Sequence, residues 1–275
     1  MSGESDPDKL QKEFQEALKR VLSASRAAEN VRAETWREET EEKRQASREA
    51  HLRFDLKPRD VKKHLDRFVI KQEGAKRVLA TTVCDHYHHV RSCRAAGKCE
   101  HYLKQNVIML GPTGVGKTYL VRSLAGLIGV PFIKADATKF REAGYVGGDV
   151  EDLVRDLVQK ADGDIDLAQC GMIYLDEVDK IASASNLVGR DVSGAGVQRG
   201  LLKIMEETEV PLRSPMDLQS QVQAVLEFQQ KGKMTKPLVN TRHILFIVSG
   251  AFDGLGAVVE RRVKGQSLGF AASAF

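Results

Sequence analysis

The sequence predicts an α/β domain in which a central parallel sheet carries helices on both faces, preceded by a charged helical extension. Two observations support this prediction. From residue 53 onward, short apolar runs rich in β-branched residues alternate with amphipathic helical stretches, the pattern of a parallel sheet covered by helices. Residues 1–52 instead carry dense charges of both signs and few apolar residues, as in a solvated helix or a flexible leader. We therefore divide the chain into an N-terminal extension, 1–52, and one large domain, 53–275.

Four apolar runs are the expected central strands of the sheet. They are Asn106–Leu110, Pro131–Ala135, Met172–Leu175 and His243–Val248. Each is apolar enough to be buried on both faces, as strands of a parallel sheet are. Between the second and third runs, apolar residues recur at helical spacing from Val150 to Val158, with Asp149 in front as the expected N-cap. That helix is expected to pack on the sheet.

Composition and charge indicate a globular protein without an obvious polyanionic partner. The 42 basic and 38 acidic side chains leave a net charge of +4, too small and too mixed to indicate binding to nucleic acid or to a membrane. No apolar run approaches the roughly 18–20 residues of a membrane span, and the N-terminus lacks the features of a signal peptide. We expect a cytoplasmic location.

The segment after the first apolar run is the strongest candidate for a binding site. Its residues are Gly111, Pro112, Thr113, Gly114, Val115, Gly116, Lys117 and Thr118, with Tyr119 next in the chain. Glycines let consecutive backbone N–H groups face one anionic centre at the N-terminus of the helix that follows. Lys117 is suited to the β- and γ-phosphates, and the Thr118 hydroxyl is suited to Mg²⁺. The motif predicts a P-loop for ATP or another nucleoside triphosphate with Mg²⁺.

Two carboxylates, Asp176 and Glu177, follow the third apolar run directly. The carboxyl edge of a parallel sheet is where ligands of open α/β folds bind, so we expect this pair near the P-loop. Asp176 is suited to hold Mg²⁺, mostly through water, and Glu177 to polarise the attacking water as general base. The alternative is an acidic turn that caps a following helix.

These motifs resemble those of the AAA+ P-loop ATPases, and within them the protein unfoldases of the ClpX and HslU type. The resemblance spans most of Leu56–Phe275. It is carried by Gly111–Thr118, Ala135–Thr138, Ile173–Lys180, Arg190–Gly194 and Ser249–Phe252. It implies an AAA+ large ATPase domain whose ATP hydrolysis is coupled to threading of unfolded polypeptide through a ring, hexameric in the full-length form.

The resemblance also implies roles for residues outside the two nucleotide motifs. Val69 and Ile70 fall in the segment that contacts adenine. Tyr145 and Val146, between Gly144 and Gly147, are similar to the aromatic pore loop that grips polypeptide. Ser249 lies where a first sensor is expected, at the end of the fourth strand. Leu268, Gly269 and Phe270 fall where such unfoldases dock on a ClpP-like peptidase, although burial at the domain edge explains them equally well.

The sequence departs from the family pattern at both ends. A charged segment stands in place of the N-terminal zinc domain, and the chain stops at Phe275, before the arginine finger and the C-terminal small domain. Because a neighbouring subunit's charge contributes about 10³–10⁵ in comparable hydrolases, we expect low activity from this chain alone. Two alternatives therefore stay open: a nucleotide-controlled regulatory or binding module with little turnover, and an AAA+ loader acting on nucleic acid.

A group of cysteines and histidines invites a zinc interpretation. Its members are Cys84, His86, His88, His89, Cys93, Cys99 and His101. No Cys-x2-4-Cys pair is present, and the histidines fall within a predicted helix, which favours a structural role.

Overall fold

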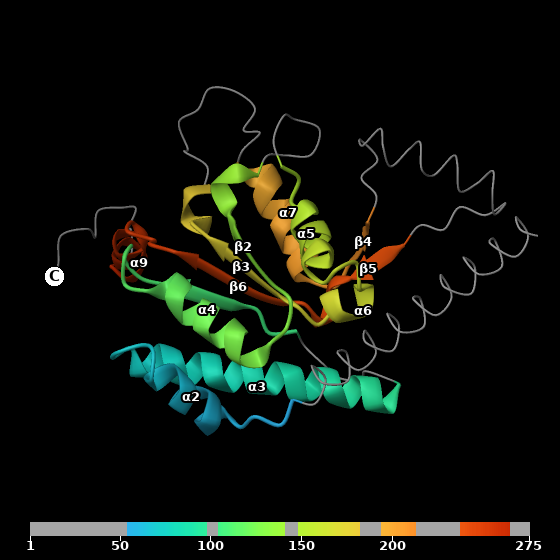
Figure 1. Cartoon of the computed structure of the whole chain (residues 1–275). Coiled ribbons are helices and arrows are strands. Elements are labelled where there is room, and N and C mark those ends of the chain that lie inside the picture. The colour runs from blue at the N-terminus through green and yellow to red at the C-terminus, as the bar shows by residue number, and fades with distance from the viewer. Residues whose placement is uncertain (1–53, 98–103, 141–147, 182–193, 213–236, 265–275) are drawn as a thin grey trace, which may run out of the picture. The chain divides into compact units, whose positions relative to one another are not determined.

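The computed structural model describes residues 54–97, 104–140, 148–181, 194–212 and 237–264 (Figure 1). The predicted extension, 1–52, lies outside this part of the chain. The described domain is built on a four-stranded parallel sheet with strand order β1-β6-β3-β2. The strands are β1 (Val107–Leu110), β2 (Phe132–Asp136), β3 (Met172–Asp176) and β6 (Leu245–Gly250). The four predicted runs are thus confirmed as strands, with ends shifted by one or two residues.

Helices cover both faces of this sheet, as predicted (Figure 1). One face packs against α2 (Pro58–Asp66), α3 (Glu73–Ala96) and α4 (Lys117–Ile128), and the other against α5 (Asp152–Lys160) and α7 (Ala195–Met205). Successive side chains of β3 point to opposite faces of the sheet, and each face has its own hydrophobic core. Met172 and Tyr174 pack in the core on the α4 side, and Ile173 and Leu175 pack in the core on the α5 side. Every residue of β6 is buried.

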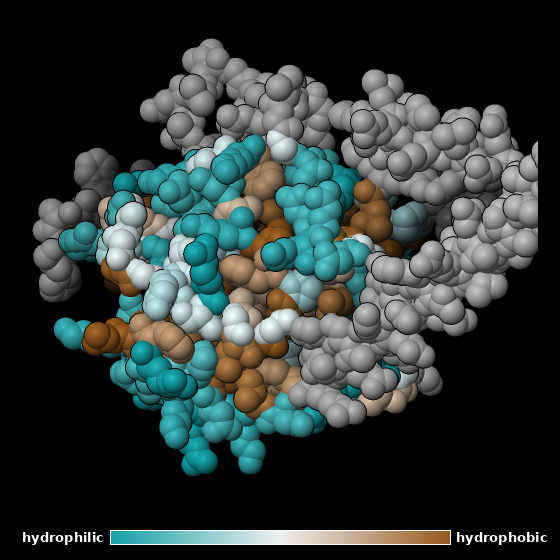
Figure 2. Space-filling view, viewed as in Figure 1, coloured by the Kyte–Doolittle hydropathy of each residue, from teal (hydrophilic) through white to brown (hydrophobic). Residues whose placement is uncertain are grey.

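Smaller elements complete the described domain. They are the short helices α6 (Ile165–Ala168), η1 (Ala137–Lys139), η2 (Val178–Ile181) and η3 (Thr241–His243), the helix α9 (Leu255–Val263), and the antiparallel strands β4 (Glu209–Pro211) and β5 (Leu238–Asn240). Hydrophilic residues cover most of the described surface seen in Figure 2, with hydrophobic residues in smaller patches between them. None of the helices within the described ranges is long and apolar enough to cross a membrane.

The prediction that every strand is buried on both faces is wrong for β1. Ile108 and Leu110 are 57% and 53% exposed, whereas Val107 and Met109 pack against the α2–α4 core. β1 pairs with β6 along one edge and stands at the end of the described sheet. The apolar run therefore predicted the strand correctly. It could not predict that one face of the strand is exposed, because exposure depends on which other elements of the fold cover that face.

The predicted cap of α5 is also wrong. The helix begins at Asp152, and its N-cap residue is Glu151. Asp149 lies two residues before this N-cap: its backbone N–H donates to Asp152 Oδ2 at 2.9 Å, and its own carboxylate accepts from the Glu151 N–H at 3.3 Å. The start of α5 is held instead by Arg155, whose guanidinium contacts Asp152 at 2.6 Å and Glu151 at 2.7 Å.

The segment joining α2 to α3 has a strained backbone. Lys71 and Gln72 have φ values of 63° and 56°, in the left-handed region that non-glycine residues rarely adopt. The buried ammonium of Lys76 stabilises the segment through ion pairs at both of its ends. It pairs with Asp66 at 2.6 Å and Glu73 at 2.8 Å, and so joins the end of α2 to the start of α3.

Replacing Lys71 by glycine is expected to stabilise the domain. Lys71 is exposed, and glycine adopts the left-handed region without the cost of about 1 kcal/mol that a Cβ brings. Urea unfolding should show a free energy of unfolding higher by about that amount. The matched control is Lys63→Gly, the same chemical change at an exposed position inside α2, which should lower stability by about 1 kcal/mol. Equal destabilisation by both changes would contradict the strain at Lys71.

Candidate active site

A cavity of about 310 Å³ opens at the carboxyl edge of the parallel sheet. Its lining comes from the loop after β1, the start of α4, the turn after β3 and the end of β6. The lining residues are Thr113, Gly114, Gly116, Lys117, Thr118, Tyr119, Asp176, Glu177, Asp179, Lys180, Gly250 and Ala251. The predicted P-loop and the predicted carboxylate pair therefore meet in one cavity, at the position where open α/β folds bind ligands.

The P-loop turns from β1 into α4 through residues with positive φ. Gly114 and Gly116 have φ values of 85° and 89°, a conformation that a side chain would strain. α4 starts at Lys117, and no side chain in the described part of the chain caps its first turn. The N–H groups of that turn, together with the positive end of the helix dipole, thus remain available to an anion in the cavity.

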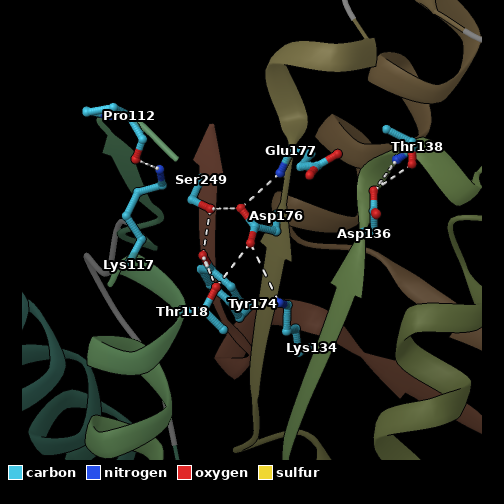
Figure 3. A network of polar contacts seen from close by, with 10 residues as sticks. All are labelled: Pro112, Lys117, Thr118, Lys134, Asp136, Thr138, Tyr174, Asp176, Glu177 and Ser249. Carbon is cyan, nitrogen blue, oxygen red and sulfur yellow. Dashed lines mark hydrogen bonds and ion pairs between the residues drawn. The ribbon is translucent and has the colours of Figure 1, made fainter. Parts of the chain in front are cut away.

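Lys117 is folded over the P-loop (Figure 3). Its Nζ donates to the carbonyl oxygens of Gly111 at 2.5 Å and Pro112 at 2.9 Å. An ammonium group has three hydrogens, so one remains for a phosphate oxygen. The loop is also tied to the α2–α3 segment, because the Gln72 side-chain amide donates to the Val115 carbonyl.

Asp176 accepts hydrogen bonds from three different elements (Figure 3). Thr118 Oγ1 donates to its Oδ2 at 3.1 Å, Ser249 Oγ donates to its Oδ1 at 2.5 Å, and the Glu177 N–H donates to Oδ1 at 3.1 Å. Burial alone would raise the pKa of Asp176, but the bonds from Ser249 and Thr118 outweigh it and hold this pKa below its usual value. The side chain is therefore an anion at neutral pH, with oxygen atoms of the kind that Mg²⁺ prefers.

Two residues that the sequence analysis did not select also face Asp176. Lys134 Nζ lies 3.7 Å from Asp176 Oδ2, and the Tyr174 hydroxyl contacts both Ser249 and Thr118. Lys134 and Tyr174 are paired residues on neighbouring strands, and Tyr174 stands two residues before Asp176 on β3. Side chains two apart lie on one face of a strand, so this spacing was the signal that could have found Tyr174.

Glu177 leaves the strand in a strained conformation. Its φ is 59°, and its exposed side chain lines the cavity. In Figure 3 its carboxylate points away from the contacts that surround Asp176. Non-glycine residues persist in this region only where the surroundings impose it, and such residues cluster at functional sites.

Asp179 lines the cavity, and its side chain links the turn after β3 to the turn after β6 by a hydrogen bond. Its Oδ2 accepts from the Phe252 N–H at 3.3 Å, and Phe252 has a φ of 55°. Its Oδ1 is buried and has no hydrogen-bond partner among the described residues. A buried acceptor at the cavity wall fits a ligand or a hydrated cation that brings its own hydrogen-bond donors.

The remaining predicted site residues differ in their position: one lines the cavity, one is buried in the core, one is exposed, and the others lie outside the described residues. Tyr119 is 52% exposed and lines the cavity. Val69 is buried in the α2–α4 core, whereas Ile70 is 88% exposed. The expected pore-loop residues Tyr145 and Val146, and the expected docking residues Leu268, Gly269 and Phe270, lie outside the described residues.

The histidines of α3 have structural contacts. A ring nitrogen of His86 lies 2.9 Å from the His243 carbonyl, and one of His88 lies 3.1 Å from the Leu56 carbonyl. No group of three or more His, Cys, Asp or Glu residues in the described ranges could hold a metal ion. Cys99 and His101 fall outside those ranges.

Comparison with known proteins gives one family and a set of similar relatives. The family described as AAA domain (Cdc48 subfamily) matches residues 103–268, more than half of the chain. The ATP-dependent Clp protease ATP-binding subunit ClpX of Azotobacter vinelandii is 42% identical over 219 residues, which cover 77% of this chain and 47% of the relative. The protein of the same name from Borrelia duttonii is 40% identical over 223 residues, covering 78% and 48%. The chain spans about half the length of these curated relatives.

Replacing Gly250 by alanine is expected to disturb the cavity wall. A Cβ at this position would stand 2.5 Å from Asp179 Oδ1 and 2.7 Å from the Phe252 ring. Overpacking of this kind costs about 1–3 kcal/mol, so urea unfolding should show that loss, and titration with ATP should show weaker binding. The control is Gly254→Ala, where a Cβ meets nothing within 4 Å. If Gly250→Ala is as stable as this control, Asp179 does not form a rigid wall.

Proposed function

The chain belongs to the AAA domain family, in its Cdc48 subfamily, and from this premise we propose that it is the ATP-driven motor domain of a ClpX-type protein unfoldase. The family is one of ATPases, so nucleotide binding follows from membership. The observation that carries the proposal is the meeting of Lys117 and Thr118 with Asp176 and Glu177 in one cavity. Phosphate-binding groups, a metal-binding carboxylate and a second carboxylate facing the same cavity are among the parts that ATP hydrolysis needs.

In this proposal the P-loop residues 111–118 hold the phosphates of ATP. The uncapped N–H groups of α4 and the remaining hydrogen of Lys117 receive phosphate oxygens. Thr118 and Asp176 hold Mg²⁺, which neutralises charge that develops on the phosphates. Ile70, as an exposed apolar residue on the segment that Gln72 ties to the P-loop, contacts the adenine together with the backbone at Val69.

Glu177 acts as general base in the proposed reaction. Its carboxylate is exposed to the cavity and is held off the hydrogen-bonded group around Asp176 by the left-handed backbone at its own position. Three donors keep Asp176 in its ionised form, and a carboxylate that resists protonation suits a metal-holding role better than proton abstraction. Ser249, which donates to Asp176, is placed to respond to the state of the same site as the first sensor.

The coupling to protein unfolding rests on similarity to relatives whose names describe the ATP-binding subunit of a Clp protease. By this similarity, copies of the chain act in a hexameric ring, Tyr145 and Val146 grip unfolded polypeptide in the pore, and Leu268, Gly269 and Phe270 dock on a ClpP-like peptidase. We propose neither nucleic acid nor a membrane as a partner. The regulatory module and the nucleic-acid loader receive no support from the relatives named above.

The roles of Glu177 and Lys117 can be separated by two substitutions. Glu177→Gln removes the base but keeps the size of the side chain, so ATP affinity should stay within about twofold while hydrolysis is lost. Lys117→Ala removes a phosphate ligand, so ATP affinity should fall by about tenfold or more. Isothermal titration with ATP and a phosphate-release assay measure the two effects. Equal loss of binding in both variants would refute the assignment.

The pore-loop role of Tyr145 is tested in the assembled ring. Tyr145→Ala should abolish unfolding of a tagged substrate while ATP binding is retained, because the aromatic ring supplies the apolar grip. Tyr145→Phe is the matched control and should unfold the substrate at a near-normal rate, since it keeps the ring and loses only the hydroxyl. Normal unfolding by the alanine variant, followed by fluorescence of the substrate, would exclude this role.

A further inference from the structure

Four polar side chains form a closed ring of contacts at the inner end of the cavity (Figure 3). Thr118 and Ser249 donate to the two oxygens of Asp176, and the Tyr174 hydroxyl lies 2.7 Å from Ser249 Oγ and 3.3 Å from Thr118 Oγ1. Three elements contribute: α4, β3 and β6. Tyr174 and Ser249 are fully buried, whereas Thr118 and Asp176 line the cavity, so the ring has one side in the protein interior and one side open to a ligand.

The number of hydrogens determines how the ring is ordered. Each hydroxyl has one hydrogen to donate, and those of Thr118 and Ser249 are directed at Asp176. Ser249 can therefore only accept from Tyr174, at the shorter of the two phenol distances. The Tyr174 oxygen can itself still accept a hydrogen bond, and the other hydroxyl within reach is that of Thr118, at 3.3 Å.

We propose that Tyr174 is a positioning residue of the metal site, which accepts the hydrogen of Thr118 and so frees Asp176 Oδ2 for the cation. The inference rests on the proposed magnesium-ATP site. When Thr118 turns its hydrogen from Asp176 to Tyr174, its oxygen keeps a lone pair for a ligand in the cavity and Asp176 Oδ2 becomes available. The three hydroxyls then form one chain from Thr118 through Tyr174 and Ser249 to Asp176 Oδ1, and each bond in such a chain strengthens the next.

Core packing alone does not account for this tyrosine. The rest of β3 that faces inward is aliphatic or sulfur-containing, and a phenylalanine would fill the same volume without a buried hydroxyl. A buried hydroxyl costs free energy unless it is bonded, and here both of its neighbours belong to the candidate site. Tyr174 thus connects the P-loop to the end of β6 through the interior of the domain.

The test compares Tyr174→Phe with the wild type in binding a non-hydrolysable ATP analogue. Calorimetric titration is done in EDTA and at graded Mg²⁺ concentrations. Without magnesium the affinity should stay within about twofold, whereas the Mg²⁺ concentration that gives half of the magnesium-dependent gain should rise about threefold to tenfold. Tyr87→Phe is the matched control: it removes the same oxygen from a buried tyrosine of α3, beside His86, which contacts His243 in the short helix η3 before β6. It should leave the magnesium midpoint unchanged.

Two outcomes would overturn the role of Tyr174. One is an unchanged magnesium midpoint, and the other is an equal loss of affinity with and without Mg²⁺, which marks a general packing defect. The double variant Tyr174→Phe/Ser249→Ala adds a check, because two members of one hydroxyl chain should not have additive effects on the midpoint. If the wild type itself shows no magnesium-dependent binding, the proposed function fails and this inference fails with it.

Discussion

The parallel pairing of β6 between β1 and β3 is the constraint on which the candidate site depends. All four described strands run the same way, so their carboxyl ends, and the loops that follow them, meet at one edge. Register then decides which side chains share a face: Asp136 pairs with Asp176, and Met109 with Ser249. A shift of β3 by one residue would turn Tyr174 and Asp176 toward α5 and away from the P-loop helix. The apolar residues of β3, buried on both faces, make such a shift costly.

Burial and polarity are therefore coupled along each central strand. The inner part of β6 is fully apolar, and its first polar side chain, Ser249, appears where the cavity begins. A buried hydroxyl at that point must find a partner, and Tyr174 and Asp176 provide it from the neighbouring strand. The hydrophobic core sets the position of the strands, while the hydrogen bonds at their ends set the orientation of the side chains that face a ligand.

Local sequence patterns were sufficient for the parts of the fold and site that depend on neighbours in the chain. The four strands, the helix after the P-loop and the carboxylate pair could be predicted because their signals lie within a few residues. Lys134 could not be assigned to the site, since its approach to Asp176 depends on the pairing of β2 with β3. Spacing along β3 places Tyr174 on the same face as Asp176, but its contact with Ser249 depends on the pairing of β3 with β6. The exposure of Ile108 and the true cap of α5 depend likewise on which elements cover a strand or reach back to a helix end.

Residues with a strained backbone are concentrated around the candidate site. Among described non-glycine residues, positive φ occurs at Lys71, Gln72, Asp162, Glu177 and Phe252. All but Asp162 lie beside the P-loop or the two turns at the strand ends, and each such residue costs about 1–3 kcal/mol. Hydrogen bonds to side chains hold three of these positions: the Gln72 amide donates to the Val115 carbonyl, the Glu177 N–H to Asp176, and the Phe252 N–H to Asp179. Because the acceptors of the last two bonds, Asp176 and Asp179, line the cavity, a ligand that competes for them would also change the balance that keeps the strained turns in place. In the proposed motor domain, that coupling is a physical route from nucleotide state to the movement of adjoining segments.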